Sequence, residues 1–239
     1  MEIIYVTILT IIAGGIGTLT GFGTSTIMVP VLLLFFPLAP TLLLVGIIHW
    51  FGDIWKIVLF RQGVRWRLIM LFGVPGVLLT FLGARLVFSV SEILLSQVLG
   101  GFLIAYVAFL FSKPSFKFKQ NALTATTGGA LSGFFAGVFG VGGAIRGAFL
   151  SAFDLPKAVY IATAGAIGLA IDTVRIGTYI TGGTILPQNL LWGLLLFIPA
   201  SFVGAHFAKK IVDRIPQKQF RMIIALFLLV VGIKLLLFP

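Results

Sequence analysis

Long apolar runs recur along the whole chain, and they constrain its fold more than any other feature of the sequence. Each run is about 18 residues or longer, enough for a helix to cross a bilayer of roughly 30 Å. Only 10% of the 239 residues are charged and 59% are hydrophobic, whereas about 25% of an ordinary soluble domain is charged. The sequence therefore predicts an all-α membrane protein, since a β-barrel would alternate polar and apolar residues. The apolar segments are 3–36, 40–60, 67–88, 92–112, 122–153, 156–180, 188–208 and 218–238.

Two of these segments, 3–36 and 122–153, are too long for one span and contain glycine-rich stretches. The first holds the stretch 21–26, GFGTST, and the second holds the stretch 140–147, GVGGAIRG. Glycine permits tight turns and close contact between helices. We therefore expect each segment to form a helix, a break and a second helix. Such a re-entrant hairpin dips into the membrane and leaves on the side where it entered.

The chain also reads as an internal duplication. The stretch 53–56, DIWK, recurs at 172–175 as DTVR, and one proline and several glycines align at the same spacing of 119 residues. We expect two repeats, residues 1–119 and residues 120–239, within one membrane domain. Each repeat would consist of a broken helix hairpin followed by three transmembrane helices.

The distribution of basic residues predicts the orientation of these repeats. Lysine and arginine cluster in three connections, residues 61–67, 113–119 and 209–221, and such clusters face the cytoplasm under the positive-inside rule. Residues 89–91 and 181–188 then lie outside, so equivalent connections lie on opposite faces and the repeats are inverted, as in many secondary transporters. We expect a multi-pass protein of the cell (plasma or inner) membrane. The net charge of +11 reflects these connections and not nucleic-acid binding.

The glycine breaks are the first candidate for a functional site. At a break the second helix begins inside the membrane, where its unpaired N–H groups and positive dipole end favour an anion. Hydroxyl groups in the first break and an arginine in the second favour the same ligand. The alternative interpretation is that the glycines only permit tight helix packing. The candidate substrate-binding residues are Gly21, Gly23, Thr24, Ser25, Thr26, Gly140, Gly142, Gly143 and Arg146.

Charged residues inside the apolar segments form a second candidate set. Intramembrane charges are costly, and they line a pathway or pair with each other. Asp53 and Lys56 are three residues apart, as are Asp172 and Arg175, so each pair lies on one helix face. The pairs either neutralise themselves structurally or act as gates and proton carriers. His49, one turn before Asp53, is either a hydrogen-bonded core residue or a proton shuttle.

The sequence contains no motif typical of catalysis or of a cofactor site. The metalloprotease helix, the nucleophile elbow and the phosphate loop are absent, and the chain has no cysteine. We therefore expect no enzyme activity, no cofactor and no metal site. The expected partners are a small anion and the lipid bilayer, and assembly into a homo-oligomer stays open.

The motifs at the breaks carry a family resemblance that covers nearly the full length. They are the stretch 21–30, GFGTSTIMVP, the stretch 133–146, GFFAGVFGVGGAIR, and the basic turn 60–67, FRQGVRWR. These stretches resemble the sulfite exporter TauE/SafE family, also called the TSUP family of anion permeases. Thr24 and Ser25 stand where glycines are common in the family. The resemblance implies transport of sulfur-containing anions such as sulfite, thiosulfate or organosulfonates, whereas the residues alone indicate only a small anion.

Three kinds of function are compatible with these features. The first is a secondary transporter that works by alternating access around a midplane site made by the paired helix N-termini. The second is an anion channel built from the same helix ends. The third is a membrane enzyme or a non-transporting assembly partner. We expect the transporter, because an enzyme would need catalytic groups and a partner protein would not need matched intramembrane ion pairs.

Overall fold

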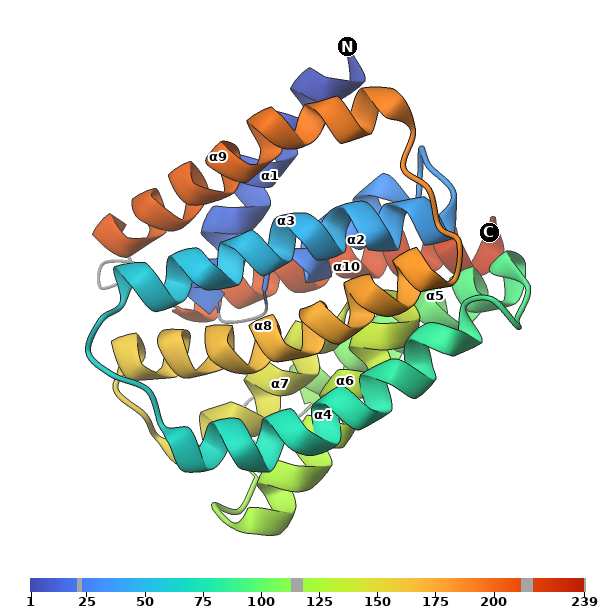
Figure 1. Cartoon of the computed structure of the whole chain (residues 1–239). Coiled ribbons are helices and arrows are strands. Elements are labelled where there is room, and N and C mark those ends of the chain that lie inside the picture. The colour runs from blue at the N-terminus through green and yellow to red at the C-terminus, as the bar shows by residue number, and fades with distance from the viewer. Residues whose placement is uncertain (21–22, 113–117, 212–216, 239) are drawn as a thin grey trace.

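The computed structural model describes residues 1–20, 23–112, 118–211 and 217–238, and these residues form helices and no strands (Figure 1). Seven of the described helices are long and apolar enough to cross a membrane. The prediction of an all-α membrane protein is thus confirmed. The elements are α1 Glu2–Thr20, α2 Ser25–Leu32, α3 Leu38–Leu59, α4 Trp66–Leu86, α5 Glu92–Ser112, α6 Ala122–Phe139, α7 Gly142–Leu150, the 3-10 turn η1 Ser151–Phe153, α8 Lys157–Thr181, α9 Gln188–Ile211 and α10 Gln217–Leu237.

Both long apolar segments are broken at their glycines. α1 ends at Thr20 and α2 begins at Ser25, while α6 ends at Phe139 and α7 begins after Gly140 and Val141. Gly23, with φ of 78°, and Gly140, with φ of 69°, adopt the left-handed conformation, which costs glycine no steric strain. Glycine at these two positions lets the chain reverse where each first helix ends.

Each short helix folds back along the helix before it. The Ser132 hydroxyl of α6 donates a hydrogen bond to the Gly142 carbonyl of α7 at 3.0 Å, and Gly128, one turn earlier on α6, lies against Phe149 near the end of α7. Residue numbers therefore rise on one helix as they fall on the other. α1 and α2 are arranged in the same way, so the molecule contains two antiparallel helix hairpins.

α3 and α8 run side by side through the centre of the molecule in opposite directions (Figure 1). Gly46 of α3 faces Arg175 of α8, and Asp53 of α3 faces Gly168 of α8. This antiparallel register brings the charged stretches of the two halves to one place.

Small residues hold the remaining helices together. α4 packs along α6 and α1 packs along α9. Gly133 of α6 approaches Gly76 of α4 so closely that an added Cβ would overlap its backbone, and Gly204 of α9 is equally close to Ile11 of α1. In lipid, where apolar side chains gain little by leaving the solvent, such close backbone approach stabilises helix pairs.

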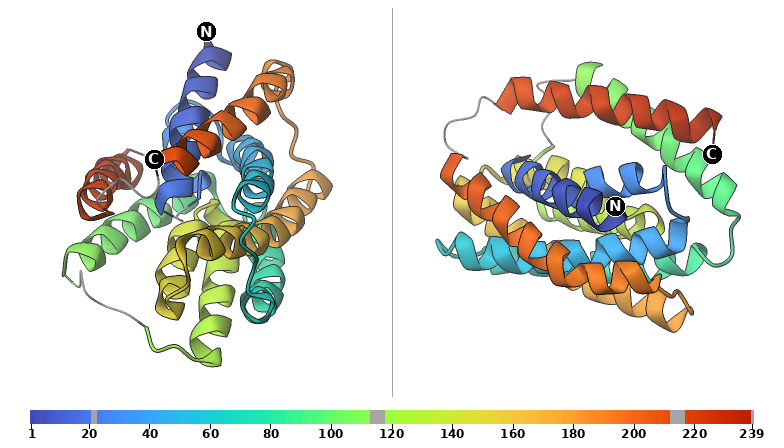
Figure 2. Two further views of the ribbon diagram at one scale, coloured as in Figure 1. Left: turned by 90° about the vertical axis from the view of Figure 1, so that its left-hand side faces the viewer. Right: turned by 90° about the horizontal axis from the view of Figure 1, so that it is seen from above.

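α5 and α10 pack on each other through Gly100 and Gly232 and form a layer at one side of the molecule (Figure 2). At the start of α3, the Leu38 N–H donates a hydrogen bond to the Glu92 carboxylate of α5.

The connections between helices gather at two ends of the molecule. The α3–α4 connection and the C-terminal end of α9 lie toward the left in Figure 1, whereas the α4–α5 and α8–α9 connections lie toward the right. Two of the three basic connections therefore begin at the same end. Most of the third, residues 113–119, lies outside the described residues.

Candidate functional site

Charged side chains gather where α3, α7 and α8 meet. Six ionisable residues there are at most 4% exposed, although a charge removed from water is costly unless another group compensates it. α3 supplies three of them, α8 two and α7 one. They are His49, Asp53, Lys56, Arg146, Asp172 and Arg175, and we refer to them as the central cluster.

Each aspartate of the central cluster pairs with the cation that follows it on its own helix. Lys56 Nζ donates to Asp53 Oδ1 at 2.6 Å, and Arg175 Nη2 lies 2.9 Å from Asp172 Oδ1. The predicted pairing of residues three apart is thus confirmed. Each half of the chain brings one neutralised pair to the centre.

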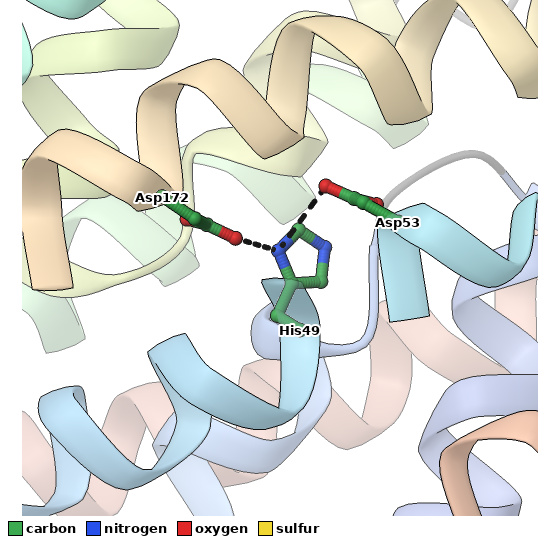
Figure 3. A group of neighbouring side chains, drawn as sticks. All are labelled: His49, Asp53 and Asp172. Atoms are coloured by element: carbon green, nitrogen blue, oxygen red, sulfur yellow. Dashed lines mark hydrogen bonds and ion pairs between the residues drawn. The ribbon is translucent and has the colours of Figure 1, made fainter. Parts of the chain in front are cut away.

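His49 joins the two halves (Figure 3). Its Nδ1 lies 2.5 Å from Asp172 Oδ2 and 3.7 Å from Asp53 Oδ2. An ionised carboxylate can only accept, so Nδ1 carries the hydrogen of this contact. Nε2 has no hydrogen-bond partner among the described residues, and it faces Gly23, where an added Cβ would lie 2.5 Å from it. His49 is therefore buried and hydrogen-bonded through Nδ1, while its Nε2 has no partner among the described residues.

Arg175 also binds the C-terminal end of α6, in addition to forming its ion pair. Its Nη1 donates to the Ala136 carbonyl at 3.4 Å, and one turn later the Tyr179 hydroxyl donates to the Gly137 carbonyl at 2.5 Å. Both carbonyls belong to the last turn of α6, the negative end of the helix dipole. Moving Arg175 as a gate would therefore also release the end of α6.

Arg146 is the cation of the central cluster without a fixed partner. In the part of the chain that the structure describes, it makes no hydrogen bond and no ion pair within 4.0 Å. Its Nη2 lies 2.9 Å from the point that a Cβ of Gly168 would occupy, and Asp53 Oδ2 lies closer still to that point. Glycine at 168 thus leaves the space into which these two side chains converge.

The charges of the central cluster do not balance. Lys56, Arg146 and Arg175 are cations, and only Asp53 and Asp172 are anions. With a neutral His49 the cluster carries one uncompensated positive charge.

The two glycine breaks lie beside the central cluster, since Gly23 lies against His49 and Gly140 against Arg175. α2 contacts α7, Gly140 lies against Val29 of α2, and an added Cβ at Gly140 would also lie 2.8 Å from Arg175 Nη1. Gly21 lies outside the described residues. The other predicted break residues are buried at the breaks or at the first turns of α2 and α7: Gly23, Thr24, Ser25, Thr26, Gly142 and Gly143.

Two residues that shape this region were missed by the sequence reasoning. Gly168 stands 119 residues after His49 and therefore occupies the equivalent position of the second repeat, a signal that the sequence does contain. Ser132 fixes the start of α7 through its bond to Gly142. A serine within a small-residue stretch gives no signal of this kind.

The central cluster also has the geometry of a possible metal site. His49, Asp53 and Asp172 offer ligand atoms within 4.8 Å of one another. The positive charge around these three residues disfavours a metal ion. Lys56 and Arg175 already neutralise the two carboxylates, and a metal ion would add to the net positive charge of the central cluster. An anion is the ligand that this arrangement favours electrostatically.

These features define a class of protein, namely a multi-pass helical membrane protein with a cluster of buried charged side chains among its helices. More narrowly, the chain belongs to the sulfite exporter TauE/SafE family, whose sequence model matches residues 6–235. The family comprises membrane transporters of sulfite and related anions and not enzymes. No curated protein and no solved structure gives a significant match to the chain.

Proposed function

We infer that the chain is a secondary transporter of a small sulfur-containing anion, which binds at the central cluster beside the two glycine breaks. The observation that carries this inference is Arg146, which is 2% exposed and has no ion pair within the described part of the chain. A buried cation without a counter-charge costs several kcal/mol, and a bound anion offsets that cost. Membership of the family supports sulfite or an organosulfonate as the substrate.

The register of α3 and α8 supports an inverted repeat. Gly46 faces Arg175 and Asp53 faces Gly168, and continuing this register puts Phe51 opposite Ala170. Those two residues are 119 apart and therefore equivalent in the duplication. A two-fold axis perpendicular to both helices would relate them, and for membrane-spanning helices that axis lies in the membrane plane.

The helix contacts support the same axis. Exchanging the halves turns the α4–α6 contact into the α9–α1 contact and the α4–α8 contact into the α9–α3 contact, and all four are present. α2 and α7 have 8 and 9 residues, or about 12–14 Å at 1.5 Å per residue. They reach only partway across a bilayer of roughly 30 Å. In our proposal the two hairpins are re-entrant and enter from opposite faces.

Alternating access follows from this symmetry. The pairs Asp53–Lys56 and Asp172–Arg175 lie on either side of the axis and serve as the inner and outer gates. The first turns of α2 and α7 present N–H groups to the anion between them. The basic connections 61–67, 113–119 and 209–221 face the cytoplasm of a cell membrane.

Flux of labelled sulfite into proteoliposomes tests this function. We expect saturable flux in the wild type. Arg146→Gln removes a charge-assisted contact of about 1.5–3 kcal/mol, so the half-saturating concentration should rise about 10- to 150-fold.

The matched control is Arg85→Gln, because Arg85 is exposed and only lies over the Phe81 ring at 5.0 Å. Its flux should equal that of the wild type. Unchanged kinetics in Arg146→Gln would exclude Arg146 from the site. Flux that never saturates would indicate a channel, and no flux of any sulfur anion by an inserted protein would reject the proposed function.

A further inference from the structure

The charge of the central cluster limits which anions it can neutralise. Three cations and two carboxylates leave one positive charge while His49 is neutral. A singly charged anion balances that charge completely. A doubly charged anion would leave one uncompensated negative charge in a buried place, which is costly in a medium of low dielectric constant.

His49 is the group that can supply the missing positive charge. Its Nδ1 already donates to Asp172 at 2.5 Å, so the open nitrogen is Nε2, which is buried without a hydrogen-bond partner among the described residues. Histidine exchanges a proton within the physiological pH range. Binding a proton at Nε2 would raise the net charge of the cluster from one to two.

A proton on Nε2 would lie beside the first glycine break, next to the proposed anion site. Nε2 points at Gly23, where the chain reverses into α2 (Figure 3 shows the ring between its two carboxylates). Once protonated, Nε2 becomes a second charged donor, beside the break where the N–H groups of the first turn of α2 begin.

The other charged groups around His49 are all accounted for. Asp53 and Lys56 share its helix, Asp172 and Arg175 face it from α8, and Arg146 comes from α7. α2 has no charged residue, and α1 has only Glu2 at its exposed start. On α9 the charged residues are Lys209 and Lys210, which are exposed. His206 of α9 stacks on Phe202, so among the described residues of the site His49 is the uncharged group that can add a positive charge.

We propose that the site binds a singly charged anion alone but takes up a doubly charged anion together with one proton, which His49 holds at Nε2. The proton comes from the solvent and converts imidazole into imidazolium, and no covalent bond to the anion forms. Sulfur oxyanions of both charges, such as sulfonates and thiosulfate, then enter the site with the same net charge. This proposal rests on the proposed function, because it concerns the same site.

Anion affinity as a function of pH tests the proposal on the wild-type protein. Methanesulfonate stays singly charged and thiosulfate stays doubly charged between about pH 5 and pH 8, the range in which histidine titrates. A complex that holds one more proton than the free site binds more tightly as pH falls, by up to about tenfold per pH unit. We expect the affinity for thiosulfate to rise in this way and the affinity for methanesulfonate to stay constant. In weakly buffered solution, thiosulfate should take up one proton per site and methanesulfonate none.

The two histidines of the chain provide a matched pair of variants. His49→Asn keeps a donor toward Asp172 and has no group that titrates, so the pH dependence for thiosulfate should vanish while methanesulfonate still binds. His206→Asn changes a residue of α9 that stacks on Phe202 and should keep the wild-type pH dependence. A purely structural role for His49 would lower both affinities without changing their pH dependence.

The outcomes separate this proposal from the function on which it rests. If both anions bind and neither affinity depends on pH, His49 carries no proton for the dianion, and the proposal is wrong while the transporter function stands. Binding of methanesulfonate alone at every pH would also overturn the proposal, since it requires a dianion to be accepted. If neither anion binds, the anion site itself is wrong.

Discussion

At the scale of single residues, the central cluster consists of compensated and uncompensated charges. Asp53 and Asp172 are each held by a cation of their own helix, and Asp172 also accepts the Nδ1 hydrogen of His49. Arg146 stands beside them without a fixed partner within the described residues. The compensated pairs explain why such charges tolerate burial, and the remaining cation is the basis of the proposed anion site.

Removal of one member of a pair should cost more than removal of both. Lys56→Met leaves Asp53 buried without its closest cation, which should lower the free energy of unfolding by about 3 kcal/mol. The double variant Asp53→Asn with Lys56→Met leaves no unpaired carboxylate and should recover most of that loss. Thermal unfolding in detergent measures both. If the double variant is no more stable than the single one, the pair is not the reason that these charges tolerate burial.

The sequence predicted the ion pairs within α3 and within α8 but not the contacts that join residues of different helices. A spacing of three residues places Asp53 and Lys56 on one helix face whatever the tertiary structure, so this contact followed from the sequence alone. The contact of His49 with Asp172 spans 123 residues and depends on the register of two helices. The place of Arg146 depends on Gly168, and no local pattern connects these two residues.

At the scale of elements, glycine has two separate tasks. Gly23 and Gly140 have positive φ and end α1 and α6, whereas Gly133 and Gly204 lie inside helices and let neighbouring backbones touch. The sequence showed where the helices break, because clustered glycines interrupt an apolar run. It could not distinguish glycines that turn the chain from glycines that pack, because that difference depends on the neighbouring helix.

The packing task can be tested with alanine. An added Cβ at Gly133 would overlap the backbone of Gly76, while an added Cβ at Gly73, also within a helix, meets nothing within 4 Å. Gly133→Ala should push α6 away from α4 and cost about 1–3 kcal/mol, as overpacking does. Gly73→Ala should leave stability unchanged or raise it slightly, because alanine favours helix.

Unfolding temperature in a single detergent measures both alanine variants. Equal stability of the two proteins would show that α4 and α6 are not packed as closely as described. Transport needs to be measured only for a variant that unfolds at the wild-type temperature.

At the scale of the whole molecule, the proposed two-fold symmetry makes a prediction about topology. Residues 61–67 and residues 181–188 are equivalent connections of the two halves, so an inverted repeat puts them on opposite faces of the membrane. A parallel repeat would put them on the same face.

Cysteine labelling distinguishes these arrangements directly, because the chain has no cysteine of its own. Gln62 and Ile185 are exposed, so each can be replaced singly by cysteine. We expect an impermeant thiol reagent to label Gln62→Cys only from the cytoplasmic face and Ile185→Cys only from the outer face. Labelling of both from the same face would exclude the inverted repeat.

The level of His49 along α3 has an electrical consequence. α3 runs from Leu38 to Leu59, so His49 lies at its midpoint, and an ion that reaches it from either face has crossed about half of the membrane field. A membrane potential that is negative inside favours outward movement of a negative charge. The free energy released is about 2.3 kcal/mol per elementary charge and per 100 mV over the full crossing. A monoanion and a dianion that travels with a proton carry the same net charge, so the voltage would drive both toward export with the same force.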